Sequence, residues 1–117
     1  MEAFSIFSFG DVLLLAVQEE IDDASINALT GLLGERVIEK KARAVVIDLH
    51  DVEIVDTFLA EHIQGLAAFL NLLRARVVVA GLTVPAVLTL LDFNIRLKGV
   101  DFALDVEQAL ARLDAKK

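Results

Sequence analysis

An acidic residue followed directly by a hydroxyl residue stands where the sequence changes from a strand pattern to a helix pattern. Asp56 and Thr57 interrupt an apolar run in the stretch EIVDTFLAEHI, residues 53–63. A second acid, Asp48, closes the apolar run at 44–47. Functional groups in open α/β sheets collect at the carboxyl ends of strands and at the N-termini of the following helices. Asp48, Asp56 and Thr57 are therefore the first candidates for a functional site.

Two roles are open for the Asp56-Thr57 pair. Aspartate and threonine are both favoured helix N-caps, where a side-chain oxygen accepts a hydrogen bond from a free backbone N–H and adds about 1 kcal/mol of stability. Alternatively, Thr57 is a phosphorylation site, because a phosphate at a helix N-terminus meets unpaired N–H donors and the positive end of the helix dipole. The phosphate would add nearly two negative charges beside the neighbouring acids, and so would change the surface that a partner meets.

Catalytic and metal-binding chemistry finds little support in the residues. The chain has no cysteine, which excludes thiol catalysis and thiolate zinc sites, and His50 and His62 are the only histidines. Thr57 and His62 are disfavoured as a nucleophile and its base, because residues five apart on a helix point about 140° apart. The histidine spacing does not suit a metal site, and no phosphate-binding glycine loop is present. We predict no catalytic, cofactor-binding or metal-binding residue; a small enzyme of flavodoxin-like layout is the hypothesis from a different class.

The composition describes an acidic and unusually apolar domain. The chain has 117 residues, of which 56% are hydrophobic, and a net charge of −7. This length fits one compact domain, 1–117, and the acidic balance argues against nucleic-acid binding. No apolar stretch reaches the roughly 20 residues of a membrane span, so we expect no membrane association and a cytoplasmic location. The high apolar content indicates that some hydrophobic residues cover surfaces that meet other chains.

The elements that must position the candidate residues alternate between strand and helix after an opening hairpin. Apolar runs predict strands at 3–9, 12–17, 44–47 and 76–82, with a weak strand or extended link in 99–104. Apolar residues spaced three and four apart predict helices at 22–39, 57–73, 84–92 and 106–113. This order predicts an α/β fold with a mixed sheet and helices packed against it.

Two details refine this prediction. Asp22 or Asp23, Pro85 and Asp105 are placed to begin helices. In the first strand, Phe7 and Phe9 share the face opposite Phe4 and Ile6, so both faces are apolar. We therefore expect something to cover the outer side of this strand, with a neighbouring helix or strand of the same chain as one candidate.

Three segments together resemble the STAS domain of anti-anti-sigma factors. They are VVIDLHDVEIVDTFLAEHI, ARVVVAGLTVPAVLTLLDFNI and GVDFALDVEQALARL. The specific marks are the IDL end of a strand, the Asp-Thr pair that opens the next helix, and the step from Gly81 to Pro85. The most similar branch contains the stressosome protein RsbS and the STAS part of its RsbR paralogues. The resemblance covers most of the chain and implies a single STAS domain over 1–117.

The resemblance also implies a role in signal transduction. In this family the hydroxyl residue directly after the aspartate is phosphorylated by a switch kinase, and the matching residue here is Thr57. RsbS-type sequences usually carry serine there, whereas threonine is more typical of RsbR-type proteins. Those have an additional N-terminal sensory domain that 117 residues cannot hold. The DTFL segment, in place of the glycine-containing DSSG of sporulation-type factors, favours the stressosome branch.

The implied function is that of a non-enzymatic stressosome scaffold. Such a protein would bind RsbR-like STAS proteins, as a homodimer or in a large oligomer, and would sequester an RsbT-like serine/threonine kinase until Thr57 is phosphorylated. A stand-alone anti-anti-sigma factor that binds an anti-sigma kinase is the alternative.

The acidic surface around Thr57 is the predicted docking surface for the kinase. Its predicted partner-binding residues are Asp48, Asp51, Glu53, Asp56 and Phe58. Acids there would steer a basic partner, and an added phosphate would change the local field most at this place. This hypothesis requires the Thr57 hydroxyl to be reachable from solvent.

Overall fold

The computed structural model describes residues 4–18 and 21–113. The strands are β1 (Phe4–Phe9), β2 (Val12–Val17), β3 (Ala44–Asp48), β4 (Arg76–Ala80) and β5 (Asp101–Ala103). The helices are α1 (Asp23–Lys40), α2 (Thr57–Leu72), α3 (Val84–Asp92) and α4 (Val106–Arg112). The predicted alternation of strand and helix after an opening hairpin is confirmed, and the weak strand is present as β5.

The strands form one mixed sheet in the order β1-β2-β3-β4-β5. β1 and β2 are antiparallel, and every later neighbouring pair is parallel. All residues of the central strand β3 are buried, which explains its continuous apolar sequence. The parallel register places Asp48, the last residue of β3, beside Ala80, the last residue of β4. The carboxyl ends of these two strands therefore meet at one edge of the sheet.

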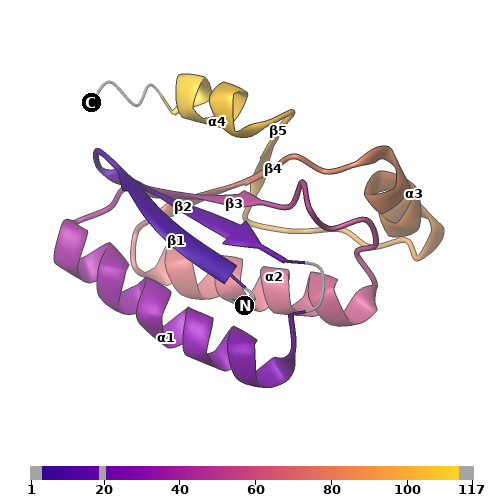
Figure 1. Ribbon diagram of the computed structural model, residues 1–117, viewed down its shortest axis with the longest axis horizontal. Helices are drawn as coiled ribbons and strands as arrows, with labels where there is room; N and C mark the ends of the chain where they lie inside the picture. Colours follow the sequence, from indigo (N-terminus) through magenta and orange to yellow (C-terminus); the bar gives the residue numbers. More distant parts are fainter. Residues whose placement is uncertain (1–3, 19–20, 114–117) are drawn as a thin grey trace.

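Helices cover the two faces of the sheet unequally. α1 and α2 pack on one face, α4 lies on the other, and α3 stands beyond the edge where the parallel strands end (Figure 1). The face under α1 and α2 carries the larger core, built around side chains such as Leu15, Leu33 and Ile47. The core under α4 is much smaller and includes Val46, Val78 and Ala109.

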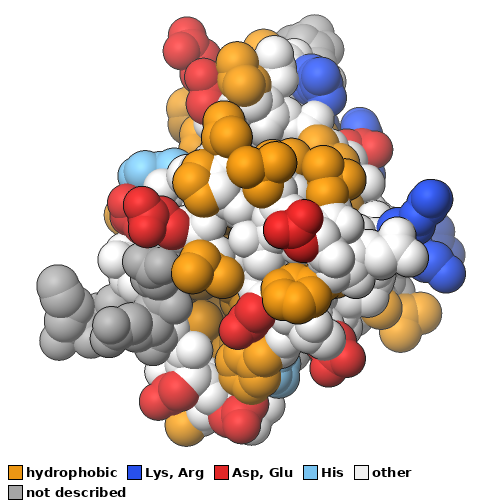
Figure 2. Space-filling view, turned by 90° about the vertical axis from the view of Figure 1, so that its right-hand side faces the viewer, with side chains coloured by type: hydrophobic (Ala, Val, Ile, Leu, Met, Phe, Trp, Pro, Cys, Tyr) orange, Lys and Arg blue, Asp and Glu red, His pale blue; other side chains and the backbone are white. Residues whose placement is uncertain are grey.

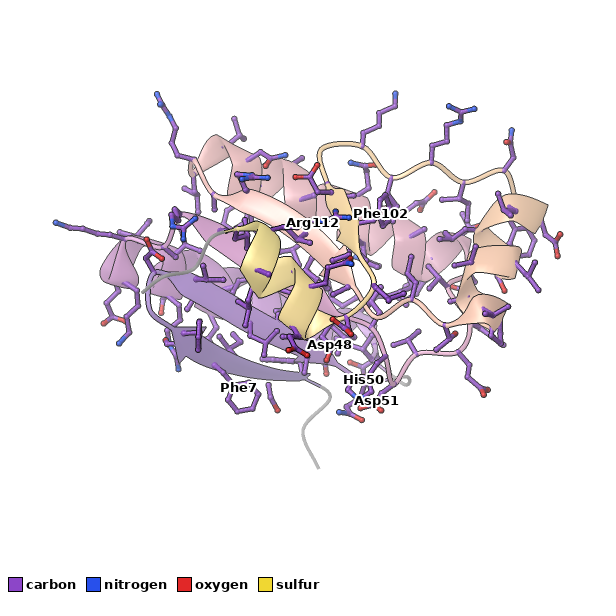
Figure 3. All side chains as sticks on the ribbon, turned by 90° about the horizontal axis from the view of Figure 1, so that it is seen from above. Phe7, Asp48, His50, Asp51, Phe102 and Arg112 are labelled. Carbon is purple, nitrogen blue, oxygen red and sulfur yellow. The ribbon has the colours of Figure 1, made fainter. Side chains whose placement is uncertain are left out.

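The face of β1 that carries Phe7 and Phe9 is not covered by another described element. Phe7 and Phe9 pair with Leu14 and Val12 across the hairpin, so they point to the face that carries α4. They are 55% and 51% exposed, and Phe7 lies at the margin of the sheet in Figure 3. The expectation that another element of the chain covers this side is wrong for the described residues, because α4 packs on β3, β4 and β5 instead.

The boundaries of several elements differ from the prediction by one or two residues. Strand β4 ends at Ala80 rather than at residue 82, because Gly81 turns the chain with a φ of +79°. Helix α1 is capped by Asp22, whose carboxylate accepts a hydrogen bond from Ser25 N at 2.9 Å. Asp105 caps α4 in the same way, as predicted. Residue 3 of the predicted first strand lies outside the described residues.

Candidate functional site

The candidate site lies at the edge of the sheet where β3 and β4 end. The segment 49–56 leads from β3 to α2, and the shorter segment 81–83 leads from β4 to α3. Buried Val52 and Val55 anchor the longer segment to the core. The other residues of the segment after Leu49 are exposed, so it presents the polar side chains of His50, Asp51, Glu53 and Asp56 to solvent.

Asp48 is the one buried acidic residue in the described part of the chain, at 8% exposure. Its Oδ2 lies 2.7 Å from His50 Nδ1, and its Oδ1 accepts a hydrogen bond from His50 N at 3.1 Å. His50 Nε2 also lies 3.2 Å from Asp51 Oδ1. Figure 3 shows these three residues gathered at the end of the sheet. The hydrogen bond to Asp48, and then the negative charge of that residue, raise the pKa of His50 above its ordinary value.

The close contacts around position 81 explain why a glycine follows β4. A Cβ at this position would lie 2.8 Å from Asp48 Oδ1 and 3.1 Å from the Cβ of His50. The absence of a side chain therefore lets the start of segment 81–83 pass directly against the Asp48–His50 pair. Leu49 N also donates to Ala80 O at 2.9 Å, which joins the two connecting segments at this point.

The Asp56-Thr57 pair divides its roles between its two residues. Asp56 is the N-cap of α2, and its Oδ1 accepts a hydrogen bond from Leu59 N at 2.9 Å. Thr57 is the first helical residue, its side chain is exposed, and its hydroxyl makes no hydrogen bond to another described residue. Asp56 therefore provides the cap of α2, and the Thr57 hydroxyl is not needed to begin the helix.

The other predicted partner-binding residues lie around this helix start. Asp51, Glu53 and Phe58 are exposed, whereas Asp48 is buried and engaged with His50. Ile54 and Phe58 are exposed apolar residues beside the start of α2. Helix α3, which stands at the same end of the molecule (Figure 1), adds the exposed side chains of Val84, Leu88 and Leu91. Figure 2 shows hydrophobic and acidic side chains interspersed on the face that contains this end of the molecule.

The two histidines contact different acidic residues, His50 with Asp48 and Asp51, and His62 with Asp23. His62 Nε2 lies 3.2 Å from Asp23 Oδ1, and its ring makes an edge contact with Phe58 at 4.6 Å between centroids. It makes no hydrogen bond to Thr57. Among the described residues, no cluster of three or more histidine, cysteine or acidic side chains is placed to hold a metal ion.

A groove beside Thr57 was not predicted from the sequence. It has a volume of about 200 Å³. Its lining residues are Thr57, Ala60, Glu61 and Gln64 of α2 and Ile95, Arg96 and Leu97 of the segment between α3 and β5. The two walls are distant in the chain, so no local pattern could indicate that they meet.

The described residues include no helix that is both long and apolar enough to cross a membrane.

Comparison with known families identifies one family. The model of the STAS domain matches residues 6–109 of the chain. No curated protein matches the sequence.

Solved structures share the fold along nearly the whole chain. A variant of RsbS from Moorella thermoacetica is 23% identical with a TM-score of 0.79, and the match covers 95% of this chain and 94% of that one. A structure described as the molecular architecture of the stressosome, a signal integration and transduction hub, is 24% identical with a TM-score of 0.80, covering 94% and 96%. The anti-sigma factor antagonist SpoIIAA in its unphosphorylated form is 12% identical with a TM-score of 0.70, covering 96% and 98%.

Proposed function

The chain belongs to the STAS domain family, and we propose that it is a non-enzymatic regulator of the RsbS type that is switched by phosphorylation of Thr57. Unphosphorylated, it holds an RsbT-like kinase within an assembly with RsbR-like STAS proteins. In the switching step, Thr57 Oγ1 forms a bond to the γ-phosphorus of ATP, the bond to the ADP oxygen breaks, and a base of the kinase takes the hydroxyl proton. The modified surface then releases the kinase.

The observation that carries this proposal is that the Thr57 hydroxyl makes no hydrogen bond to another described residue. Asp56 already caps α2, so a phosphoryl group on Thr57 displaces no structural hydrogen bond. The side chain is exposed, so a kinase has access without opening the core. The backbone N–H groups of Thr57 and Phe58 have no acceptor among the described residues, and they lie at the positive end of the helix dipole. The helix start therefore tolerates a dianion.

The charges around Thr57 support a switch in partner binding. Asp51, Glu53 and Asp56 are exposed acids that would attract a basic surface. A phosphoryl group adds nearly two further negative charges at the same place, which changes the field and adds bulk beside exposed Phe58. Asp48 would contribute indirectly, by holding His50 at the rim of this surface. We propose that this surface docks the kinase.

The comparisons support the choice of branch and assembly. The chain shares its fold with an RsbS variant and with a stressosome structure. The exposed side chains Val84, Leu88 and Leu91 on α3 provide apolar surface for association with other STAS domains.

A stand-alone anti-anti-sigma factor is the second candidate function. The fold is also that of SpoIIAA, an anti-sigma factor antagonist whose structure is known in unphosphorylated and phosphorylated forms. Such a protein would bind an anti-sigma kinase directly and would not need a large scaffold.

Phosphate transfer from a cognate kinase tests the site. The protein is incubated with an RsbT-like kinase and ATP, and intact-mass spectrometry measures the modified fraction. Thr83→Ala is the matched control, because Thr83 stands at the start of α3 but uses its hydroxyl as a cap. We expect Thr57→Ala to lose at least tenfold in modified fraction and Thr83→Ala to match the wild type. Equal labelling of Thr57→Ala and wild type would overturn the site assignment.

Size-exclusion chromatography separates the two candidate functions. Mixed with an RsbR-like STAS protein, a stressosome component should elute in a complex far larger than either protein alone. A persistent small dimer, combined with stable binding of an anti-sigma kinase, would instead establish the stand-alone function.

A further inference from the structure

The groove beside Thr57 contains one basic side chain. Arg96 comes from the segment between α3 and β5, and Thr57 comes from the first turn of α2. Glu61 is the one acid that lines the same groove. Arg96, an exposed residue with a long flexible side chain, therefore lines the same hollow of about 200 Å³ as the proposed phosphoacceptor.

The backbone that carries Arg96 is held against α2. Gln64 forms two hydrogen bonds with Lys98. The Nε2 of Gln64 donates to the carbonyl oxygen of Lys98, and the backbone N–H of Lys98 donates to the Oε1 of Gln64, both at 2.6 Å. Asn71 Nδ2 donates to Gly99 O at 3.1 Å. On the other side of Arg96, Ile95 N donates to Leu90 O at 2.9 Å and its side chain packs against the main core. Figure 1 shows this segment running beside α2.

The side chain of Arg96 has no acceptor in the part of the chain that the structure describes. It makes no hydrogen bond or ion pair with any described residue, and Glu61 is not paired with it. By contrast, Arg76 pairs with Asp101 at 3.0 Å, and Arg112 donates to Phe102 O. Arg96 is thus placed beside Thr57 on a fixed segment with its donors unoccupied by described residues.

We propose that Arg96 receives the phosphoryl group of phosphorylated Thr57. The inference rests on the proposed function, because it concerns what the chain does with that phosphoryl group. A guanidinium offers a planar pair of N–H donors that matches two phosphate oxygens, and such charge-assisted bonds are about twice as strong as neutral ones. Glu61 and Asp56 repel the phosphoryl group, and Arg96 offsets that repulsion.

The contact gives phosphorylation a structural consequence inside the chain. The Thr57–Arg96 contact would join the segment between α3 and β5 to the N-terminus of α2. The hydrogen bonds of Gln64 and Asn71 already join the same segment to α2, but farther along the helix. The modified protein then presents an ordered Thr57–Arg96 pair to a partner, and Arg96 is no longer available to other acceptors.

The test does not depend on any kinase. Phosphothreonine is incorporated directly at position 57 during expression, and ³¹P NMR measures the second pKa of the phosphoryl group. An adjacent cation favours the dianion, so we expect a lower phosphoryl pKa in the protein with Arg96 than in its Arg96→Gln variant, by about half a pH unit at this exposed site. The matched control is Arg74→Gln, because Arg74 lies beyond the opposite end of α2 and pairs with no described side chain.

Amide hydrogen exchange gives a second readout. With phosphothreonine at 57, residues 95–97 should exchange several-fold more slowly than in the unmodified protein, and Arg96→Gln should remove this difference. Arg96→Lys should keep part of the pKa shift, because it keeps the charge but loses the paired donors. If the phosphoryl pKa and the exchange rates are the same with Arg96 as in the Arg96→Gln variant, the inference is overturned. Failure of the kinase to label Thr57 would instead overturn the proposed function.

Discussion

The starts of α2 and α3 use the same residue type differently. Both helices begin at the edge where the parallel strands end, and both have a threonine at the boundary. In α3, Thr83 is the N-cap, and its hydroxyl accepts a hydrogen bond from Ala86 N at 3.2 Å. In α2 the cap is Asp56, and Thr57 stands one position later with its hydroxyl unused by any described residue. The hydroxyl of the threonine at the cap position is used in the structure, whereas the hydroxyl of the threonine one position later is available for modification.

The two segments that lead into these helices also differ, in length and in how closely they pack. Segment 81–83 is short and passes tightly against the Asp48–His50 pair, as the contacts around Gly81 show. Segment 49–56 is longer, and it carries the exposed acids and Ile54. The α3 connection packs into the edge of the sheet, whereas the α2 connection carries the surface that would dock a partner under the proposed function. Substitutions at both connections test this contrast, in order of decreasing expected effect.

Replacing Gly81 should give the largest effect. Gly81→Ala forces a Cβ to within 2.8 Å of Asp48 Oδ1 at a φ of +79°, so we expect the free energy of unfolding to fall by about 2–3 kcal/mol. Urea unfolding measures this change. Gly31→Ala is the control, because a Cβ there meets no atom within 4 Å and should stabilise α1 by up to about 1 kcal/mol. An equal, small effect at both glycines would show that the edge is not tightly packed.

Removing either cap should have an intermediate effect. Asp56→Ala and Thr83→Ala each leave a backbone N–H without its acceptor, so each should lower the free energy of unfolding by about 1 kcal/mol. Asp56→Asn keeps a capping oxygen and should lose much less. Thermal unfolding followed by circular dichroism compares the three variants, and a neutral Asp56→Ala would contradict the assignment of the cap.

Removing the Thr57 hydroxyl should cost little stability. Thr57→Ala removes no hydrogen bond to a described residue and shortens a side chain that is already exposed, so the free energy of unfolding should change by less than about 0.5 kcal/mol. Urea titration of Thr57→Ala and Thr83→Ala side by side measures the difference. A loss equal to that of Thr83→Ala would mean that the two threonines are equivalent, and the contrast between the helix starts would disappear.

The smallest effect should come from the titration of His50. Its pKa is raised in the folded chain by the hydrogen bond to Asp48. The protonated ring therefore stabilises the fold fully below the ordinary histidine pKa, and this contribution is lost as the pH rises through the raised pKa. Because the side chain is 63% exposed, we expect no more than about 0.5 kcal/mol. NMR titration should show the His50 pKa falling in Asp48→Asn, and an unchanged value would exclude the Asp48 contact as its cause.

Much of the fold was predictable because it follows from short-range patterns. The buried run of β3, the spacing of apolar residues in α2 and the cap at Asp105 are encoded within a few neighbouring residues. The same logic placed Asp56 and Thr57 at the start of a helix. It left open which of them is the cap, because that depends on backbone angles that either residue type can adopt.

The rest of the site depends on contacts between distant segments. The groove of Thr57 and Arg96 exists because Gln64 holds the backbone of Lys98, which no periodicity in the sequence indicates. The alternation of side chains along a strand correctly placed Phe7 and Phe9 on one face of β1. Whether another element covers that face depends on where α4 crosses the sheet, which the alternation does not indicate. The predicted docking role of the exposed residues around Thr57 stays a prediction.

The small core under α4 has a consequence for how the molecule opens. Ala109 and Leu113 are the buried anchors of this end of the chain, and Arg43 and Arg112 add hydrogen bonds to the carbonyl oxygens of Leu113 and Phe102. Few buried apolar contacts and partly solvated hydrogen bonds give a region a low free energy of local unfolding. We therefore expect α4 to unfold locally while β2, β3 and β4 stay folded, which would expose Val46 and Val78 to solvent at a lower free-energy cost than global unfolding.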